Sequence, residues 1–138
     1  MVNLPDEAIE MFSNENCDKE KPLIWVSTVG TDSMPHSVPV CFVKVIDKDK
    51  LLIAVNFITH TATNIKMGSM VSVSVAVPYN GYMTVGKGKV YTSGELFEDA
   101  AGRVKERFGG KVESKAAILF QIQRIYKLTP TASKKEIT

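Results

Sequence analysis

The chain has 138 residues, of which 44% are hydrophobic and 23% are charged, and its formal net charge is +2. This size and balance predict one soluble globular domain over residues 1–138, able to bury a core without disulfides or a structural metal. The small net charge argues against the strong basic surface of a dedicated nucleic-acid binder. No apolar run is long enough to span a membrane, and we expect no signal peptide.

The first half of the chain predicts one helix and three strands. Residues 4–14 open with Pro5 and two acidic residues, as helices commonly do. Residues 15–21 are too polar for a core and should form a loop, so that residues 1–22 make an N-terminal helix and loop. The hydrophobic period then changes to two, which predicts strands at 23–29, 36–46 and 51–57.

The second half predicts two helices and three further strands. Residues 70–77 alternate valine with serine or alanine, and residues 78–81, which contain an Asn80-Gly81 pair, predict a hairpin turn. Residues 95–108 carry hydrophobic side chains at helical spacing, and Gly109 follows as a helix stop. The other expected elements are a short helix at 61–67 and strands at 82–92 and 117–128.

Six strands joined mostly by tight turns indicate antiparallel pairing. A six-stranded antiparallel barrel with short flanking helices is favoured, because closing a sheet removes its exposed edges. The alternative is a flat sheet capped by helices. The polar residues 131–138, with Lys134 and Lys135, are expected to be a solvated tail.

Residues 54–64 are the most informative segment for chemistry. A strand is expected to end there and a short helix to begin, so that free backbone N–H groups and the helix dipole meet. Thr59 and Thr61 supply hydroxyl groups, and His60 supplies a cation or a neutral donor. This set suits a terminal phosphate. The alternative is ordinary capping of the helix by Thr59 or Thr61, with His60 exposed to solvent.

The remaining residues with reactive or aromatic side chains have simpler interpretations. His36 is expected to be a surface histidine near a turn, because no second ligand stands at metal-binding spacing. Trp25 is expected in the core. Cys17 and Cys41 show no metal-ligand spacing, and Cys41 falls in a strand pattern where a buried thiol acts as a small hydrophobe. Reduced cysteines and a cytoplasmic location follow, and no catalytic residue is identified.

Several runs have the sequence and order of a known family. Residues 24–30 form an opening strand and glycine turn, residues 35–42 read P-H-S-V-P-V-C-F, and residues 125–130 close the domain as I-Y-K-L-T-P. In this order and spacing they resemble the FMN-binding split-barrel family, which includes pyridoxamine 5'-phosphate oxidase and small bacterial FMN-binding proteins. The likeness extends over about residues 4–130 and implies a split β-barrel.

The resemblance also implies a homodimer, with two FMN sites at the subunit interface and a small-molecule electron donor or acceptor. Backbone groups of the second and third strands would contact the flavin, and the loop after the third strand would hold the phosphate. The residues implied in cofactor binding are Val40, Cys41, Phe42, Lys44, Val55, Asn56, Thr59, His60, Thr61 and Asn64.

The chain departs from the family pattern at two places. The phosphate loop, typically S-R-K, here reads Thr59-His60-Thr61. A charge-assisted contact contributes about 1.5–3 kcal/mol and a neutral one about 0.5–1.5, so FMN should bind more weakly than in the oxidases. Because imidazole changes charge between about pH 5 and 8, affinity should fall as the pH rises from about 5.5 to 8. The oxidase's C-terminal substrate signature is absent, which argues against pyridoxamine phosphate oxidation itself.

Three functions remain open at this point. The first is a flavin oxidoreductase, in which bound FMN does the redox chemistry. The second is a non-catalytic FMN-binding or electron-transfer protein, favoured by the lack of a recognisable substrate motif. The third is a split-barrel relative that binds a deazaflavin or haem, or that uses the barrel only for dimerisation.

Overall fold

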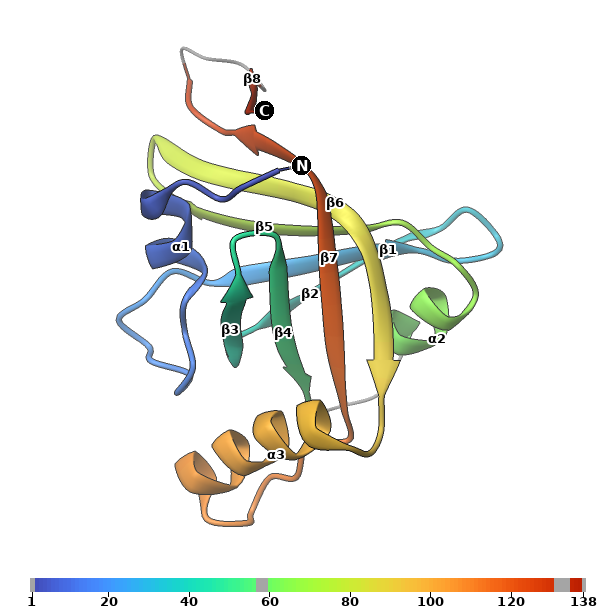
Figure 1. The fold of residues 1–138 in the computed structure, drawn as a ribbon. Coiled ribbons are helices and arrows are strands. Elements are labelled where there is room, and N and C mark those ends of the chain that lie inside the picture. Colours follow the sequence, from blue (N-terminus) through green and yellow to red (C-terminus); the bar gives the residue numbers. More distant parts are fainter. Residues whose placement is uncertain (1, 57–59, 131–134, 138) are drawn as a thin grey trace.

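In the computed structural model, which describes residues 2–56, 60–130 and 135–137, eight strands form one antiparallel sheet (Figure 1). The strand order is β2-β1-β5-β6-β7-β4-β3, with β8 beside β7. The two end strands of this curled sheet, β2 and β3, do not pair within the described residues, so the barrel is split and the predicted fold class is confirmed. The elements are α1 (Asp6–Phe12), β1 (Ile24–Val29), β2 (Pro35–Val40), β3 (Val43–Asp47), β4 (Lys50–Val55), α2 (His60–Lys66), β5 (Val71–Val77), β6 (Asn80–Tyr91), α3 (Glu95–Phe108), β7 (Ala116–Lys127) and β8 (Lys135–Ile137).

The sheet has eight strands and not six for two reasons. Residues 36–46, expected as one strand, are split into β2, which pairs with β1, and β3, which pairs with β4. The break falls between Val40 and Val43, where the chain stops pairing with β1 and begins to pair with β4. The second reason is β8, which pairs with the end of β7 where a solvated tail was expected. Ile137 packs against the main core there.

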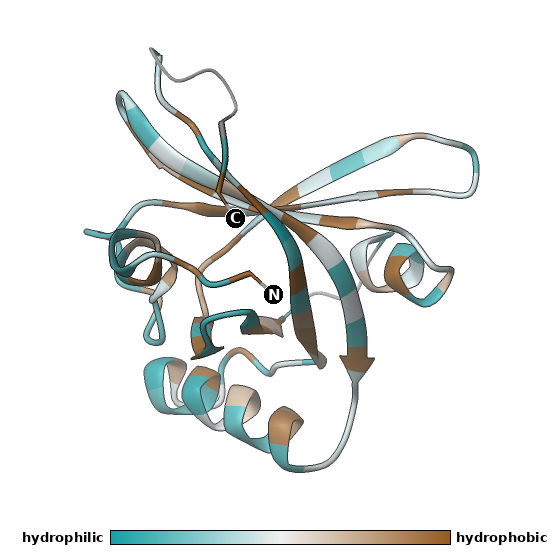
Figure 2. Ribbon diagram, turned by 45° about the horizontal axis from the view of Figure 1, so that its top comes forward, coloured by the Kyte–Doolittle hydropathy of each residue, from teal (hydrophilic) through white to brown (hydrophobic). Residues whose placement is uncertain are grey.

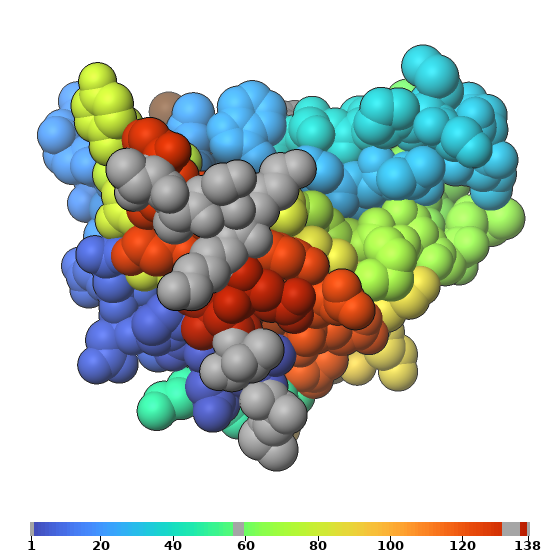
Figure 3. Space-filling view, turned by 90° about the horizontal axis from the view of Figure 1, so that it is seen from above, coloured from blue at the N-terminus to red at the C-terminus, as the bar shows by residue number. Residues whose placement is uncertain are grey.

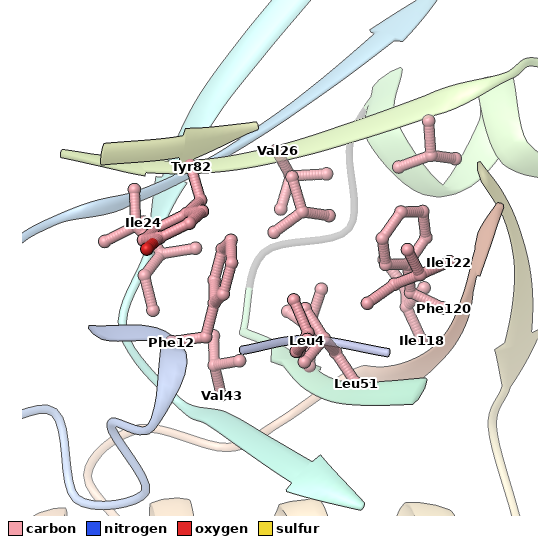
Figure 4. Close-up of a cluster of buried hydrophobic side chains, with 14 of the residues drawn as sticks. Leu4, Phe12, Ile24, Val26, Val43, Leu51, Tyr82, Ile118, Phe120 and Ile122 are labelled. Atoms are coloured by element: carbon pink, nitrogen blue, oxygen red, sulfur yellow. The ribbon is translucent and has the colours of Figure 1, made fainter. Parts of the chain in front are cut away.

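The main core fills the space inside the curled sheet and is closed at one end by α1. Phe12, Leu51 and Phe120 are fully buried and come from α1, β4 and β7 (Figure 4). Burying a side chain of this size stabilises the fold by roughly 1.5–3 kcal/mol. The inward residues of β1 alternate with outward ones, as the sequence pattern predicts.

A second, smaller cluster lies on the outer face of the sheet, under α3. Its buried members come from the β2–β3 junction, β4, α3 and β7, and α3 is amphipathic, with hydrophobic and hydrophilic segments alternating along it (Figure 2). Ala100 and Val104 are the buried residues of α3. The helix ends as predicted, because Gly109 takes a left-handed conformation with φ of 62°.

The β5–β6 hairpin turn lies within the predicted residues 78–81, but it is made by the first two of them and not by the Asn-Gly pair. Asn80 already pairs with Val77, so Pro78 and Tyr79 form the two-residue turn. The glycine is needed for a different reason: a Cβ atom on Gly81 would lie 2.5 Å from the Val75 carbonyl oxygen. Gly81 is therefore required by the close approach of the two strand backbones, although beside Asn80 it reads as a turn residue in the sequence.

The long strands β6 and β7 change register at Gly86. A Cβ atom there would lie 1.9 Å from the Gln121 carbonyl oxygen, so the site accepts only glycine without movement of the backbone. Such bulges bend the strands and help a sheet to curl.

The Glu7 carboxylate fixes α1 to the barrel. It accepts hydrogen bonds from the Asn80 amide at 3.0 Å, from the Tyr82 hydroxyl at 2.7 Å and from the Lys127 ammonium at 3.4 Å. These hydrogen bonds, that from Asn80 foremost, lower the pKa of Glu7 to about 2. Burial raises the pKa of Tyr82, whose hydroxyl makes the shortest of the three contacts.

The described start of the chain and β8 lie near each other in Figure 1. Both Val2 and Ile137 pack against the main core. Within the described residues, each helix is too short or too polar to cross a membrane.

Candidate functional site

A cavity of about 520 Å³ opens between β1, β2, β4 and α2. Its walls are largely apolar, because most of its lining comes from hydrophobic residues of β1, β2 and β4. Among the described residues that line it, none is charged. They are Leu23, Val26, Val38, Pro39, Val40, Cys41, Phe42, Ala54, Val55, Asn56, Thr61 and Ile118.

The polar part of the lining comes from Asn56 and Thr61, which follow β4 and begin α2. The Oδ1 atom of Asn56 and the Oγ1 atom of Thr61 are buried and have no hydrogen-bond partner among the described residues. Thr61 is only 4% exposed. Buried polar atoms without a partner are uncommon in folded proteins, so two of them in one cavity lining indicate a place for a polar ligand group.

Six residues implied by the resemblance line this cavity. The structure therefore brings the β2–β3 junction, the end of β4 and the start of α2 together as the sequence suggested. The six lining residues are Val40, Cys41, Phe42, Val55, Asn56 and Thr61. Of the other four implied residues, Thr59 lies outside the described residues. Lys44, His60 and Asn64 are described but do not line the cavity.

Lys44 faces α3 and not the cavity. Its ammonium lies 3.2 Å from the Asp99 carboxylate, which also pairs with Arg103 on the next turn of α3. Strand β3 sends Val43 into the main core, so the neighbouring Lys44 points to the opposite face. This lysine holds α3 against the sheet.

Asn64 has a structural partner. Its amide donates to the Thr28 hydroxyl at 3.0 Å, and both side chains are buried. The bond ties α2 to β1 and fixes the helix at the edge of the cavity. Asn64 thus acts on the site by positioning α2.

His36 is not the surface turn residue that the sequence indicated. It lies on β2 opposite Thr28, on the same inward strand face as Val38 and Val40. Its ring packs edge to face against the ring of His60, with centroids 5.2 Å apart. The signal that could have found it is the period of two that His36 shares with Val38 and Val40.

Cys17 and Cys41 form a disulfide, so the prediction of two reduced cysteines is wrong. The loop after α1 folds back onto the β2–β3 junction, where Asn14 exchanges backbone hydrogen bonds with Val43 and brings Cys17 within reach of Cys41. A stable disulfide is rare in a reducing cytosol. The cytoplasmic location therefore no longer follows from the cysteines and stays a prediction.

The lining also includes apolar residues that were not expected to contact a ligand. Val26, Val38 and Ile118 belong to the inward faces of β1, β2 and β7, and they wall the cavity as a continuation of the main core. An alternating pattern reveals that such residues point inward, but not that the space beside them is open.

One family model matches most of the chain. The sequence model of the family described as "Pyridoxamine 5'-phosphate oxidase" matches residues 8–134. An uncharacterized protein of Methanocaldococcus jannaschii is 28% identical over 142 aligned positions, which cover 97% of this chain and 88% of that protein.

Solved structures share the fold at lower identity. HupZ of group A Streptococcus superposes with a TM-score of 0.79 at 21% identity, covering 98% of this chain and 99% of that one. An FMN-binding protein from Syntrophomonas wolfei gives a TM-score of 0.73 at 16% identity, covering 89% of this chain and 87% of that one.

Proposed function

The chain belongs to the pyridoxamine 5'-phosphate oxidase family, and we propose from this premise that it is an FMN-binding flavoprotein that acts as an oxidoreductase. The observation that carries the proposal is the cavity between β1, β2, β4 and α2, with unpartnered Asn56 and Thr61 oxygens in an otherwise apolar lining. FMN matches this lining, because it combines a flat, mostly apolar ring system with a charged phosphate tail.

The cavity fits such a ligand in size as well as in chemistry. Its volume of about 520 Å³ lies in the range of roughly 300–1,000 Å³ that small-molecule sites occupy. FMN, when bound, supplies hydride and electron transfer, whereas the protein supplies binding, orientation and exclusion of water. Thr61 would donate its buried hydroxyl to the phosphate, and Asn56 would bond polar atoms of the ligand.

Backbone groups on β2 are the main candidates for hydrogen bonds to the ring. The Phe42 carbonyl already accepts from Ala54, and the Val55 carbonyl already accepts from Lys115. Strand β2, in contrast, ends the strand order and has β1 as its only strand partner within the described residues. Its free edge leaves backbone donors and acceptors beside Val40 and Cys41.

We propose that the reaction partner is a small-molecule electron donor or acceptor, and not pyridoxamine phosphate. Among the described residues that line the cavity, no side chain is an acid or a base, so proton transfer would depend on the ligand and solvent. A protein that only carries FMN and electrons is the second candidate, and this lack of an acid–base group favours it.

We further propose that two copies pair through the outward faces of β1, β2 and β5. Trp25, expected in the core, is 43% exposed there because Ile24, Val26 and Thr28 take the inward positions of β1. In Figure 3, β1 and β2 occupy one long side of the molecule in light blue and cyan. An uncharged face can meet its own copy across a two-fold axis without charge repulsion. Its residues are Trp25, Ser27, Val29, Pro35, Ser37, Ser72, Ser74 and Ala76, together with Leu23 and Pro39, which also line the cavity.

Reconstitution with FMN tests the cofactor, and an acceptor screen tests the activity. We expect saturable quenching of flavin fluorescence on titration with the protein, and oxidation of reduced nicotinamide by the complex. A yellow complex that is reversibly reduced but oxidises no donor would favour the carrier. A protein that leaves FMN fluorescence unchanged at millimolar concentration would contradict both.

Light scattering tests the homodimer independently of the cofactor. Wild type should have twice the mass of the chain, and Trp25→Glu should be monomeric because it places a charge in the uncharged face. A monomeric wild type would contradict the proposed interface.

A further inference from the structure

The two histidines of the chain come together in space. Their ring centroids are 5.2 Å apart and the ring planes meet at 67°. The Nε2 atom of His36 is buried and has no hydrogen-bond partner among the described residues. His60 is exposed on the other side of the pair.

Two neighbouring contacts fix the position of His60 relative to His36. His36 is the cross-strand partner of Thr28 on β1, and His60 stands one helical turn before Asn64 on α2. The Asn64–Thr28 hydrogen bond therefore sets His60 beside His36. The spacing matches, because one helical turn rises about 5.4 Å and antiparallel partners lie about 4.5–5.5 Å apart.

The pair lies at the edge of the cavity. Val38 and Val40 line its β2 wall, and His36 is the next residue on the same inward face. Thr61, which directly follows His60, lines the cavity with its buried, unpartnered hydroxyl. Two imidazoles and a hydroxyl thus gather beside the start of α2.

This combination of groups favours an oxyanion over a metal ion. Three or more His, Cys, Asp or Glu side chains do not cluster anywhere in the described part of the chain, so a metal would lack ligands. Imidazole N–H groups and a hydroxyl are donors, and a phosphate monoester has enough oxygens to accept from all of them.

We propose that His36, with His60 and Thr61, binds the phosphate monoester of the ligand in the cavity, and that His36 makes the site select the phosphorylated flavin over the unphosphorylated one. The proposal rests on the proposed function, since FMN is the phosphate monoester considered. Asn64 and Thr28 are positioning residues for this site.

The test compares FMN with riboflavin, which lacks the phosphate. His36→Phe keeps an aromatic ring against His60 but removes both nitrogens. Lys66→Gln is the matched control, since it removes a positive charge from the exposed end of α2. We expect His36→Phe to weaken FMN binding about tenfold with riboflavin binding unchanged. Lys66→Gln should change either affinity less than about twofold.

A second measurement needs no variant. In the wild-type protein, the imidazole proton resonances of both histidines should shift together and saturably when inorganic phosphate is added. A shift of the His60 resonances alone would overturn the role of His36, as would an unchanged ratio of FMN to riboflavin affinity in a folded His36→Phe protein.

The outcomes separate this inference from the proposed function. If wild type binds FMN and His36→Phe keeps its selectivity, the flavoprotein proposal stands and the role of His36 is refuted. If wild type binds neither flavin but phosphate shifts both histidines, the flavoprotein proposal fails and the anion site remains. If neither flavin nor phosphate acts, both are refuted.

Discussion

Reducing the Cys17–Cys41 disulfide should lower the stability of the protein substantially. The bond joins residues with a sequence separation of 24, and closing a loop of that length removes unfolded-chain entropy equivalent to about 3.5 kcal/mol at 25 °C. For a domain of this size, a loss of that magnitude corresponds to a decrease in Tm of roughly 10–15 °C. The effect arises in the unfolded chain, so the fold itself should persist after reduction at low temperature.

Thermal unfolding followed by circular dichroism, with and without a phosphine reductant, measures this difference. Cys17→Ser/Cys41→Ser is the control, because its Tm should match that of the reduced wild type and ignore the reductant. A thiol assay on native, unreduced protein must find no free thiol. Two free thiols would refute the bond, and a reduced protein within about 2 °C of the oxidised one would refute the loop-entropy reasoning.

Two further predictions concern acid unfolding and backbone geometry. The pKa of Glu7 is lowered to about 2, so its contribution to stability is complete above the usual value of 4.5 and is lost as the pH falls from there towards 2. Glu7→Gln should flatten that part of an acid-unfolding curve, and an unchanged curve would show that the contact is unimportant. Gly86→Ala should destabilise by about 1–3 kcal/mol in urea unfolding, because its methyl would meet the Gln121 carbonyl; a neutral effect would mean that the bulge relaxes easily.

The alternation of hydrophobic residues was enough to predict most of the fold. Residues 70–77 and 95–108 carried strong periods, and β5 and α3 lie where those periods fall. The junction at Phe42 could not be predicted, because a strand that ends and restarts within two residues leaves no turn signal. β8 could not be predicted either, because it is a short polar segment with one apolar side chain and so has no hydrophobic period.

The candidate site was predictable where it depends on sequence order and not where it depends on tertiary contact. Asn56 and Thr61 follow β4 in the chain, and a role in ligand binding could be suggested from that position alone. The contacts of His36 with His60, and of Lys44 with Asp99, join residues far apart in the chain. Only the register of β1 with β2 and the docking of α3 create them.

The separation of the two hydrophobic clusters has a consequence for motion. The cluster under α3 lies on the opposite face of the sheet from the main core, and it includes Phe42, whose ring also packs against Phe108 near the end of the helix. Such a layer can detach while the barrel stays intact, as a separate cooperative unit. Amide protons of α3 should then exchange with deuterium well before those of β6 and β7. Since Phe42 also lines the cavity, the same detachment would open a route from solvent to the cavity.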